Sequence, residues 1–349
     1  MSVDLSKLIS RRKIELAELN GKTVAIDAYN VLYQFLSIIR QQDGSLLMDS
    51  KGRVTSHLSG LFYRTIDIIG YGIKPIYVFD GLPSALKQKT IEARMTRRND
   101  AYKAWESARE AGNLEGARMH AQASSRVDKN IVESSKKLLD YMGVAYISAP
   151  SEGEGQASYM CKNGQVYAVG SQDYDTLLFG AKNVVRNLTF SGRRKLPKKN
   201  VYVNVEPELV NLDDTLNALG ISNRQLVWIG IMLGTDFNDG IKGVGPKTAL
   251  KIAKGAKSID DIKAYIMQKY KQEFELPIED VESLFLNPEV VDIDDKFIAD
   301  ARAIHPDVEG IVGFMCGEHE FLEDRIRKFA NVLVDKSSKA KQSTIGTWF

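Results

Sequence analysis

Two short acidic stretches determine the predicted fold, Pro150-Ser151-Glu152-Gly153-Glu154 and Ser171-Gln172-Asp173-Tyr174-Asp175. Each holds two carboxylates one residue apart, and each follows an apolar run, residues 144–147 and 166–169. Such runs are typical of buried parallel strands, and the functional crevice of an open α/β sheet lies where its strands end. We therefore expect four carboxylates at one sheet edge. Like-charged pairs about 4 Å apart would repel by roughly 4 kcal/mol, so this edge needs cations, and oxygen ligands suit magnesium or manganese.

The first stretch also has a purely structural interpretation. Ser151 at the N-cap and Glu154 at the third helical position would form a capping box for a helix over residues 156–161. Asp173 and Asp175 alone would suit a solvated loop, because aspartate favours turns. The choice depends on whether carboxylates recur at other strand ends.

They recur in the first eighty residues. Residues 23–26 predict a strand that ends at Asp27, and residues 74–79 predict another that ends at Asp80. Helical patterns lie between them, and this alternation predicts an α/β fold, a mostly parallel central sheet with helices on both faces. Four strand ends would then carry six carboxylates. Asp236, after an apolar helix over residues 225–233, would be a seventh.

Composition gives broader limits. The chain has 349 residues, of which 44% are hydrophobic, and a net charge of +2 that says little about its partners. Cys161 and Cys316 have neither disulfide nor zinc spacing, which fits a reducing compartment. No apolar run is long enough to cross a bilayer. We expect a soluble intracellular protein with no membrane partner.

Residues 83–130, which we call the arch, are a charged insertion directly after Asp80. Tyr102 and Trp105 lie among basic residues at helical spacing: Lys87, Lys89, Arg94, Arg97, Arg98 and Lys103. One interpretation is a solvated helical hairpin. The position beside the carboxylates favours a basic element that holds a polyanion over metal ions.

A second basic segment follows Asp175. Residues 184–190 and 201–203 predict a β-hairpin, whose tip would carry Arg193, Arg194 and Lys195. This tip is a candidate phosphate contact or merely a soluble turn.

A third basic segment spans residues 240–250. Gly243 and Gly245 precede a helix, so backbone N–H groups could approach a phosphate. Because the segment lacks the third glycine of a dinucleotide fingerprint, we exclude a nicotinamide site. Lys242 and Lys247 flank the pair, which predicts a helix–hairpin–helix that grips a nucleic-acid backbone without reading its bases.

The end of the chain forms a separate predicted element. Residues 336–343 have a composition typical of disorder, yet large apolar groups follow them. Gln342, Ile345, Trp348 and Phe349 would suit a helical turn that inserts into a hydrophobic pocket of a partner. The alternative is a tail that folds back onto the body.

Together these motifs resemble the flap endonuclease family, the structure-specific 5′ nucleases of replication and repair, in its archaeal and eukaryotic branch. The resemblance runs from Asp27 to the tail, and its specific markers are Tyr77-Val78-Phe79-Asp80-Gly81, Ala149-Pro150-Ser151-Glu152, Ser171-Gln172-Asp173-Tyr174-Asp175, Val185-Arg186-Asn187-Leu188-Thr189, Gly234-Thr235-Asp236 and residues 240–250.

The resemblance implies a PIN-like fold and a two-metal phosphodiesterase. It implies two bound magnesium ions, for which manganese should substitute. Their ligands would be Asp27, Asp80, Glu152, Glu154, Asp173, Asp175 and Asp236. Lys87 and Arg94 would face the scissile phosphate. Tyr33 would stack on a base near the cut, the alternative being a core tyrosine. Residues 225–255 would hold uncleaved duplex as a helix–two-turn–helix, which binds potassium in some members.

The expected organisation follows from the same resemblance. One nuclease domain would span residues 1–335, with an N-terminal region at 1–105 and an internal region at 122–255. The 5′ single strand would pass through the arch. Residues 336–349 would be a flexible tail that docks on the sliding clamp, PCNA. We expect a monomer that acts on branched DNA with a 5′ flap, in the nucleoid of an archaeon or the nucleus of a eukaryote.

Three departures from the family pattern stand out. Ser2 replaces a glycine, and Leu82 replaces a lysine of the basic lining. Gly153 and Gly155 replace alanines, and because each glycine costs up to ~1 kcal/mol in a helix, we expect a loose first turn that alanine would stabilise. Two alternatives to a DNA endonuclease remain, a catalytically silent junction-binding scaffold tethered to the clamp and a ribonuclease with the same sheet.

Overall fold

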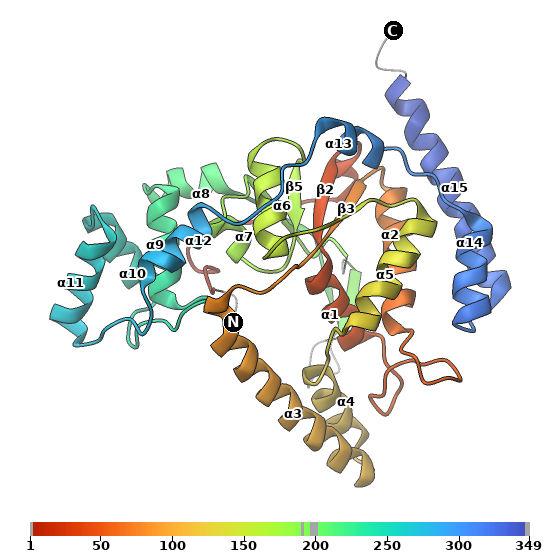
Figure 1. Ribbon diagram of the computed structural model, residues 1–349, viewed down its shortest axis with the longest axis horizontal. Coiled ribbons are helices and arrows are strands. Elements are labelled where there is room, and N and C mark those ends of the chain that lie inside the picture. The colour runs from red at the N-terminus through yellow and green to blue at the C-terminus, as the bar shows by residue number, and fades with distance from the viewer. Residues whose placement is uncertain (1–2, 190–191, 196–201, 346–349) are drawn as a thin grey trace.

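The computed structural model describes residues 3–189, 192–195 and 202–345 (Figure 1). Its centre is a seven-stranded sheet in the order β1-β9-β6-β5-β2-β3-β4. The strands from β6 to β4 in this order are parallel, and β9 pairs antiparallel with β6 and β1. The α/β prediction is therefore confirmed. The strands are β1 Arg12–Lys13, β2 Thr23–Asp27, β3 Lys74–Phe79, β4 Tyr146–Ser148, β5 Ala168–Gly170, β6 Asn183–Arg186 and β9 Glu208–Asn211.

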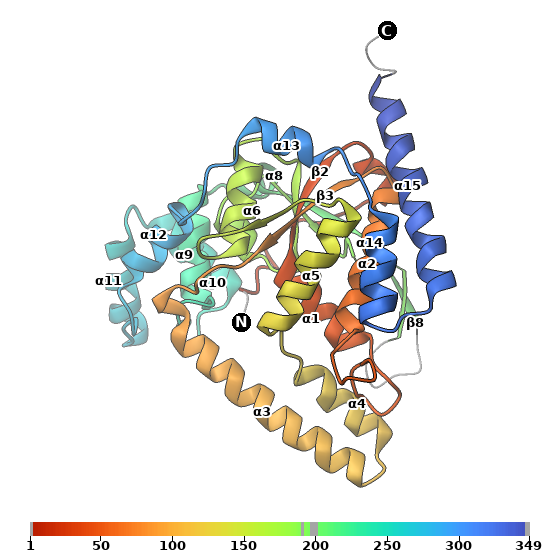
Figure 2. The same cartoon turned by 45° about the vertical axis from the view of Figure 1, so that its right-hand side comes forward.

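Helices surround this sheet in three groups, which Figures 1 and 2 show from two sides. The first group, with α1, α2 and α5, covers one face of the sheet. The second group, α3 and α4, projects away from the body as the arch. The third group, with α9 to α12, lies at the opposite end from α14 and α15. Their bounds are α1 Ala28–Ile38, α2 Ser56–Gly70, α3 Gln88–Glu110, α4 Leu114–Ala123, α5 Lys129–Met142, α6 Gly153–Lys162, α7 Asp175–Leu178, α8 Leu212–Leu219, α9 Asn223–Leu233, α10 Pro246–Gly255, α11 Ile259–Tyr270, α12 Ile278–Leu286, α13 Asp295–Ala301, α14 Val308–Val312 and α15 Glu323–Ile345.

Strand β2 contributes side chains to both hydrophobic cores, one on each face of the sheet. Side chains alternate along a strand, so Val24 and Ile26 of β2 pack with α1, α2 and α5. Ala25 faces the other way, into the cluster that contains α6 and α9. Because β2 is buried along its whole length, its carboxyl end is fixed by packing on both faces.

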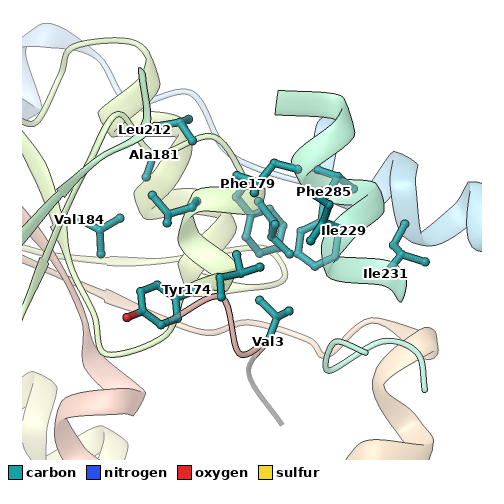
Figure 3. Packing of buried hydrophobic residues seen from close by; sticks show 14 of the residues in the cluster. Val3, Tyr174, Phe179, Ala181, Val184, Leu212, Ile229, Ile231 and Phe285 are labelled. Atoms are coloured by element: carbon teal, nitrogen blue, oxygen red, sulfur yellow. The ribbon is translucent and has the colours of Figure 1, made fainter. Parts of the chain in front are cut away.

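The second core joins the sheet to the helices that follow it (Figure 3). Phe285 of α12 lies between two aromatic rings, with centroids 4.8 Å from Phe179 and 5.4 Å from Phe237. Val3 is buried in the same cluster. This packing holds the turn after α9, which carries Asp236, against the edge of the sheet.

Two local predictions are wrong. Residues 192–195 form strand β7, which pairs with β8 Tyr202–Val205 as a separate two-stranded sheet, while β6 pairs with β9 instead. Arg193, Arg194 and Lys195 therefore lie in a strand rather than at a tip. The capping box at Ser151 is also absent, because α6 begins at Gly153 and its N-cap is Glu152 rather than Ser151.

The end of the chain differs from the expected flexible tail. Helix α15 continues to Ile345 and includes Gln342, whereas Trp348 and Phe349 lie outside the described residues. Ile326, Ala330 and Leu333 bury one face of this helix against α2. None of the helices in the described ranges is long and apolar enough to cross a membrane.

Candidate metal centre and nucleic-acid interface

Sheet topology brings the predicted carboxylates together. Asp27 ends β2, and β3, β4 and β5 are followed by Asp80, Glu152 and Asp173. These four strands are consecutive neighbours and run parallel, so their carboxyl ends share one edge. Electrostatic coupling links the full set, Asp27, Asp80, Glu152, Glu154, Asp173, Asp175 and Asp236.

Polar groups of the protein orient the first carboxylates of this cluster. Asp27 caps α1 and accepts a hydrogen bond from the Asn30 backbone N–H at 2.9 Å. The amide of the same Asn30 side chain donates to Asp173 Oδ2 at 2.9 Å. Asp80 Oδ1 accepts from the Gly153 backbone N–H at 2.8 Å. Asn30 was not predicted, because its role depends on a contact with a residue 143 positions away.

The remaining carboxylates are oriented in the same way. The Ser171 hydroxyl donates to Glu154 Oε1 at 3.1 Å. The Val3 backbone N–H donates to Asp175 Oδ1 at 2.9 Å. The beginning of the chain therefore contributes directly to the cluster.

Crowded, buried carboxylates resist ionisation. Burial and then the charge of Asp80 raise the pKa of Asp27 to about 8. Burial also raises the pKa of Asp175 to about 7 and the pKa of Asp80 to about 6. For Glu154, burial and Asp173 raise the pKa well above its usual value. The cluster thus favours any cation that can enter it.

Two arch cations already lie in the cluster. Lys87 Nζ pairs with Glu152 and lies 3.9 Å from Asp236 Oδ2. Burial lowers the pKa of Lys87, but Glu152 and Asp80 more than compensate, and its pKa is raised. One Arg94 nitrogen donates to both oxygens of Asp236. Burial opposes the effect, yet nearby positive charges, Arg94 first, hold the pKa of Asp236 below its usual value.

The donor set fits divalent cations. Seven carboxylates provide hard oxygen ligands, the kind that magnesium and manganese prefer. Within the described part of the chain, no three such side chains are already grouped as the ligands of one ion. Glu152 and Asp236 instead contact Lys87 and Arg94. Metal entry would therefore exchange these ion pairs for metal contacts.

A cleft of about 1610 Å³ connects the carboxylates to the arch. Its walls include Asp27 and Asp80 at the sheet, Tyr33 on α1, and residues of both arch helices. Tyr33 is half-buried and its ring lies 4.6 Å from the Arg98 guanidinium of α3. Tyr33 is thus a partly exposed cleft residue. Arg98 also lines the cleft, whereas its spacing had indicated only one of several basic residues on a helix.

Gly153 has a different role from the one its sequence suggests. A Cβ at this position would lie 2.7 Å from Asp80 Oδ1, closer than non-bonded atoms can approach. The glycine allows the backbone to donate to Asp80. At Gly155, the nearest atom to a Cβ would be 3.2 Å away, on Pro288. The expectation that alanine would stabilise position 153 is therefore at odds with this geometry.

The other predicted DNA contacts lie away from the cleft lining. Lys242, Gly243 and Gly245 are exposed in the connection from α9 to α10, and Lys247 is exposed in the first turn of α10. Gly243 has φ +87, a left-handed conformation that favours glycine, and Gly245 caps α10. The turn thus presents a helix N-terminus between two lysines. For Arg193, Arg194 and Lys195 the structure describes the backbone only.

Comparison with known proteins agrees with this geometry. The chain matches the XPG N-terminal domain over residues 3–101 and the XPG I-region over residues 143–236. It is 47% identical to flap endonuclease 1 of Pyrococcus furiosus, over 100% of this chain and 99% of the relative. Flap endonuclease 1 of Methanosarcina acetivorans is 48% identical, with both chains fully covered.

Solved structures give the same result. Flap endonuclease-1 from Methanococcus jannaschii superposes with a TM-score of 0.73 at 38% identity, over 97% of this chain and 99% of that one. The catalytic core of Rad2 in complex with a DNA substrate has the same fold, with a TM-score of 0.68 at 22% identity and coverage of 95% and 100%. The chain therefore belongs to the flap endonuclease family.

Proposed function

We propose that this protein hydrolyses phosphodiester bonds at 5′ flaps of branched DNA, with magnesium as its cofactor. The observation that carries the proposal is the convergence of seven carboxylates beside two arch cations at one end of a large cleft. Okazaki fragment processing, DNA repair and a 5′ exonuclease activity are further parts of the proposal. They rest on family membership.

Bound magnesium would supply an activated water and stabilise the leaving oxygen. The seven carboxylates would hold two such ions, and manganese would substitute. Lys87 and Arg94 would supply positive charge at the attacked phosphate, where preorganised donors have their largest effect on rate. Their present partners, Glu152 and Asp236, keep both side chains inside the cleft before DNA arrives.

The rest of the cleft would position the DNA. The ring of Tyr33 would stack on a base, in place of the Arg98 guanidinium that now lies over it. The 5′ strand would pass beneath α3 and α4, while the exposed lysines around Gly243 and the N-terminus of α10 would hold the duplex backbone. A potassium ion at this turn is part of the same proposal.

The C-terminal residues would bind a sliding clamp of the PCNA type. The support is the sequence pattern of Gln342, Ile345, Trp348 and Phe349. Deletion of residues 342–349 should abolish stimulation by the clamp and leave intrinsic cutting nearly unchanged. Loss of intrinsic cutting would contradict this part.

The decisive experiment is cleavage of a labelled double-flap DNA with magnesium by the wild type and by Asp173→Ala. Asp67→Ala, at an exposed position of α2, is the control. We expect cutting near the junction by the wild type and the control only. Binding without cutting by the wild type would instead support the silent scaffold, and preferred cutting of single-stranded RNA would support a ribonuclease.

A further inference from the structure

The segment Val185-Arg186-Asn187-Leu188-Thr189 marks the family but has no role in the site described so far. Arg186 is the last residue of β6, and β6 pairs in parallel with β5. The loop after β5 carries Asp173, and Asp175 follows as the first residue of α7. Arg186 therefore lies at the same sheet edge, beside the loop that holds two of the carboxylates.

Its guanidinium contacts this loop on both sides of Asp173. Arg186 Nε donates to the Gln172 carbonyl at 3.2 Å, and Nη1 donates to the Tyr174 hydroxyl at 2.7 Å. The guanidinium carbon also lies 4.5 Å from the centre of the Tyr174 ring. Glu208 Oε2, from β9, is 3.5 Å from Nη1 and balances the charge. The planar fork of arginine fixes both partners at once.

We propose that Arg186 is a positioning residue for metal binding, acting through Gln172 and Tyr174 on the direction of Asp173 and Asp175. Its Nε and Nη1 groups donate to the protein, and only 19% of its side chain is exposed. The loop is also fixed from within, since Thr176 Oγ1 donates to the Asp173 carbonyl at 2.9 Å. Without Arg186, the turn before Asp175 would keep this internal bond and the Asn30 contact to Asp173, but it would lose both hydrogen bonds that join it to the end of β6.

The inference rests on the proposed metal centre, so its test reads metal binding directly. Mn²⁺ affinity of the full-length protein is measured by electron paramagnetic resonance for wild type, Asp173→Ala, Arg186→Ala, Arg186→Lys and Tyr174→Phe. The matched control is Arg325→Ala, which removes a guanidinium 4.9 Å from the Tyr63 ring, on α15 and away from the cluster. Cleavage kinetics on flap DNA are recorded in parallel.

We expect Arg186→Ala to weaken Mn²⁺ binding about 10- to 100-fold, the usual effect of losing a residue that orients metal ligands. Lysine keeps the charge but not the fork, so Arg186→Lys should stay weakened. Tyr174→Phe should give a smaller loss in the same direction, and Arg325→Ala none. The kcat for flap DNA should fall while KM stays constant.

Unchanged Mn²⁺ affinity with a raised KM that lysine restores would overturn the proposal and make Arg186 a phosphate contact. If Arg186→Ala does not fold, Tyr174→Phe decides, and unchanged affinity there would overturn it too. Equal Mn²⁺ binding by wild type and Asp173→Ala would reject the metal centre itself. The two failures are therefore distinguishable.

Discussion

Helices α3 and α15 both have 23 residues, yet they are attached to the protein in opposite ways. Helix α3 has no buried residue, and ion pairs of Lys89 and Arg94 join it to the body, with Lys87 just before it. Helix α15 buries Ile326, Ala330 and Leu333 against α2. Charges at the cleft therefore contribute to holding α3, together with its packing on α4 and the Trp105 hydrogen bond to the Asp43 carbonyl. Buried apolar surface holds α15.

The largest expected effect is a loss of catalytic rate from a substitution next to α3, at Lys87. Lys87→Ala should lower kcat on flap DNA about 10²- to 10³-fold, the usual loss for one preorganised donor, and change DNA affinity much less. Lys328→Ala, on the exposed face of α15, is the control. Single-turnover cleavage and DNA binding separate the two quantities, and an equal loss in both would make Lys87 a binding contact only.

Substitutions in the buried face of α15 should change stability and leave catalysis unchanged. Leu333 is fully buried, so Leu333→Ala should reduce the free energy of unfolding by about 2–5 kcal/mol with kcat unchanged. Leu322→Ala removes the same atoms from a side chain that is 78% exposed and should change stability little. A large drop in kcat for folded Leu333→Ala would break the comparison.

The face beneath α15 should also be sensitive to acid. His57 of α2 is buried beside Ser134 of α5, with 2.7 Å between Nε2 and Oγ. Burial, followed by His319, lowers the pKa of His57 to about 3. Because the unfolded chain binds this proton below pH 6.5 and the folded chain does not, the His57 contribution to stability falls as pH decreases from 6.5 towards 3. The raised pKa values of Asp27, Asp80 and Asp175 act in the opposite direction.

The loss from His57 should reach about 2 kcal/mol at pH 5. Chemical denaturation at pH 7 and pH 5 measures it. The difference in unfolding free energy between wild type and His57→Gln should change by this amount between the two pH values. The difference between wild type and His120→Gln, on α4, should stay constant. An equal slope in wild type and His57→Gln would show that other groups control acid stability.

The two glycines in the first turn of α6, Gly153 and Gly155, should respond to alanine with opposite changes in stability. Gly153→Ala should displace Asp80 and lower stability by about 1–3 kcal/mol, the usual effect of overpacking. Gly155→Ala has more room and gains up to ~1 kcal/mol of helix propensity. Thermal unfolding compares the two, and stabilisation by both would restore the original expectation of a loose turn.

The smallest effect should come from salt. Lys89 pairs with Asp239 and Glu275 at exposed positions, where screening is strong, since the Debye length falls from about 10 Å at 0.1 M to about 3 Å at 1 M salt. Hydrogen exchange in the first turns of α3 should therefore accelerate at 1 M, while exchange in the buried part of α15 should not. Lys89→Gln should remove the salt dependence.

Sequence alone predicted the features that depend on local pattern. Apolar runs located β2 and β3. The aspartates at their carboxyl ends marked the sheet edge where the carboxylates meet, because strand ends in a parallel sheet are neighbours by topology. Long-range contacts were out of reach. The bridge from Asn30 to Asp173, the close approach of Gly153 to Asp80 and the contacts of Arg186 each join side chains that no local periodicity relates.

Loops and ends were the other source of error. Basic residues 193–195 suggested a turn, but strand pairing of β7 with β8 outweighed that composition. The polar stretch after residue 335 suggested disorder, yet it continues a helix whose apolar positions begin ten residues earlier. In both cases the neighbouring segment, rather than the residues themselves, determined the structure.

The ion pair between Arg94 and Asp236 spans 142 positions, and this has a consequence for biosynthesis. Asp80 is made about 156 residues before Asp236, which at ~5–20 residues per second is a delay of about 10–30 s. During that interval a ribosome-bound chain has its first carboxylates but lacks the last. With the metal centre proposed above, a nascent chain that ends before Asp236 lacks one of the seven carboxylates and should not cut DNA.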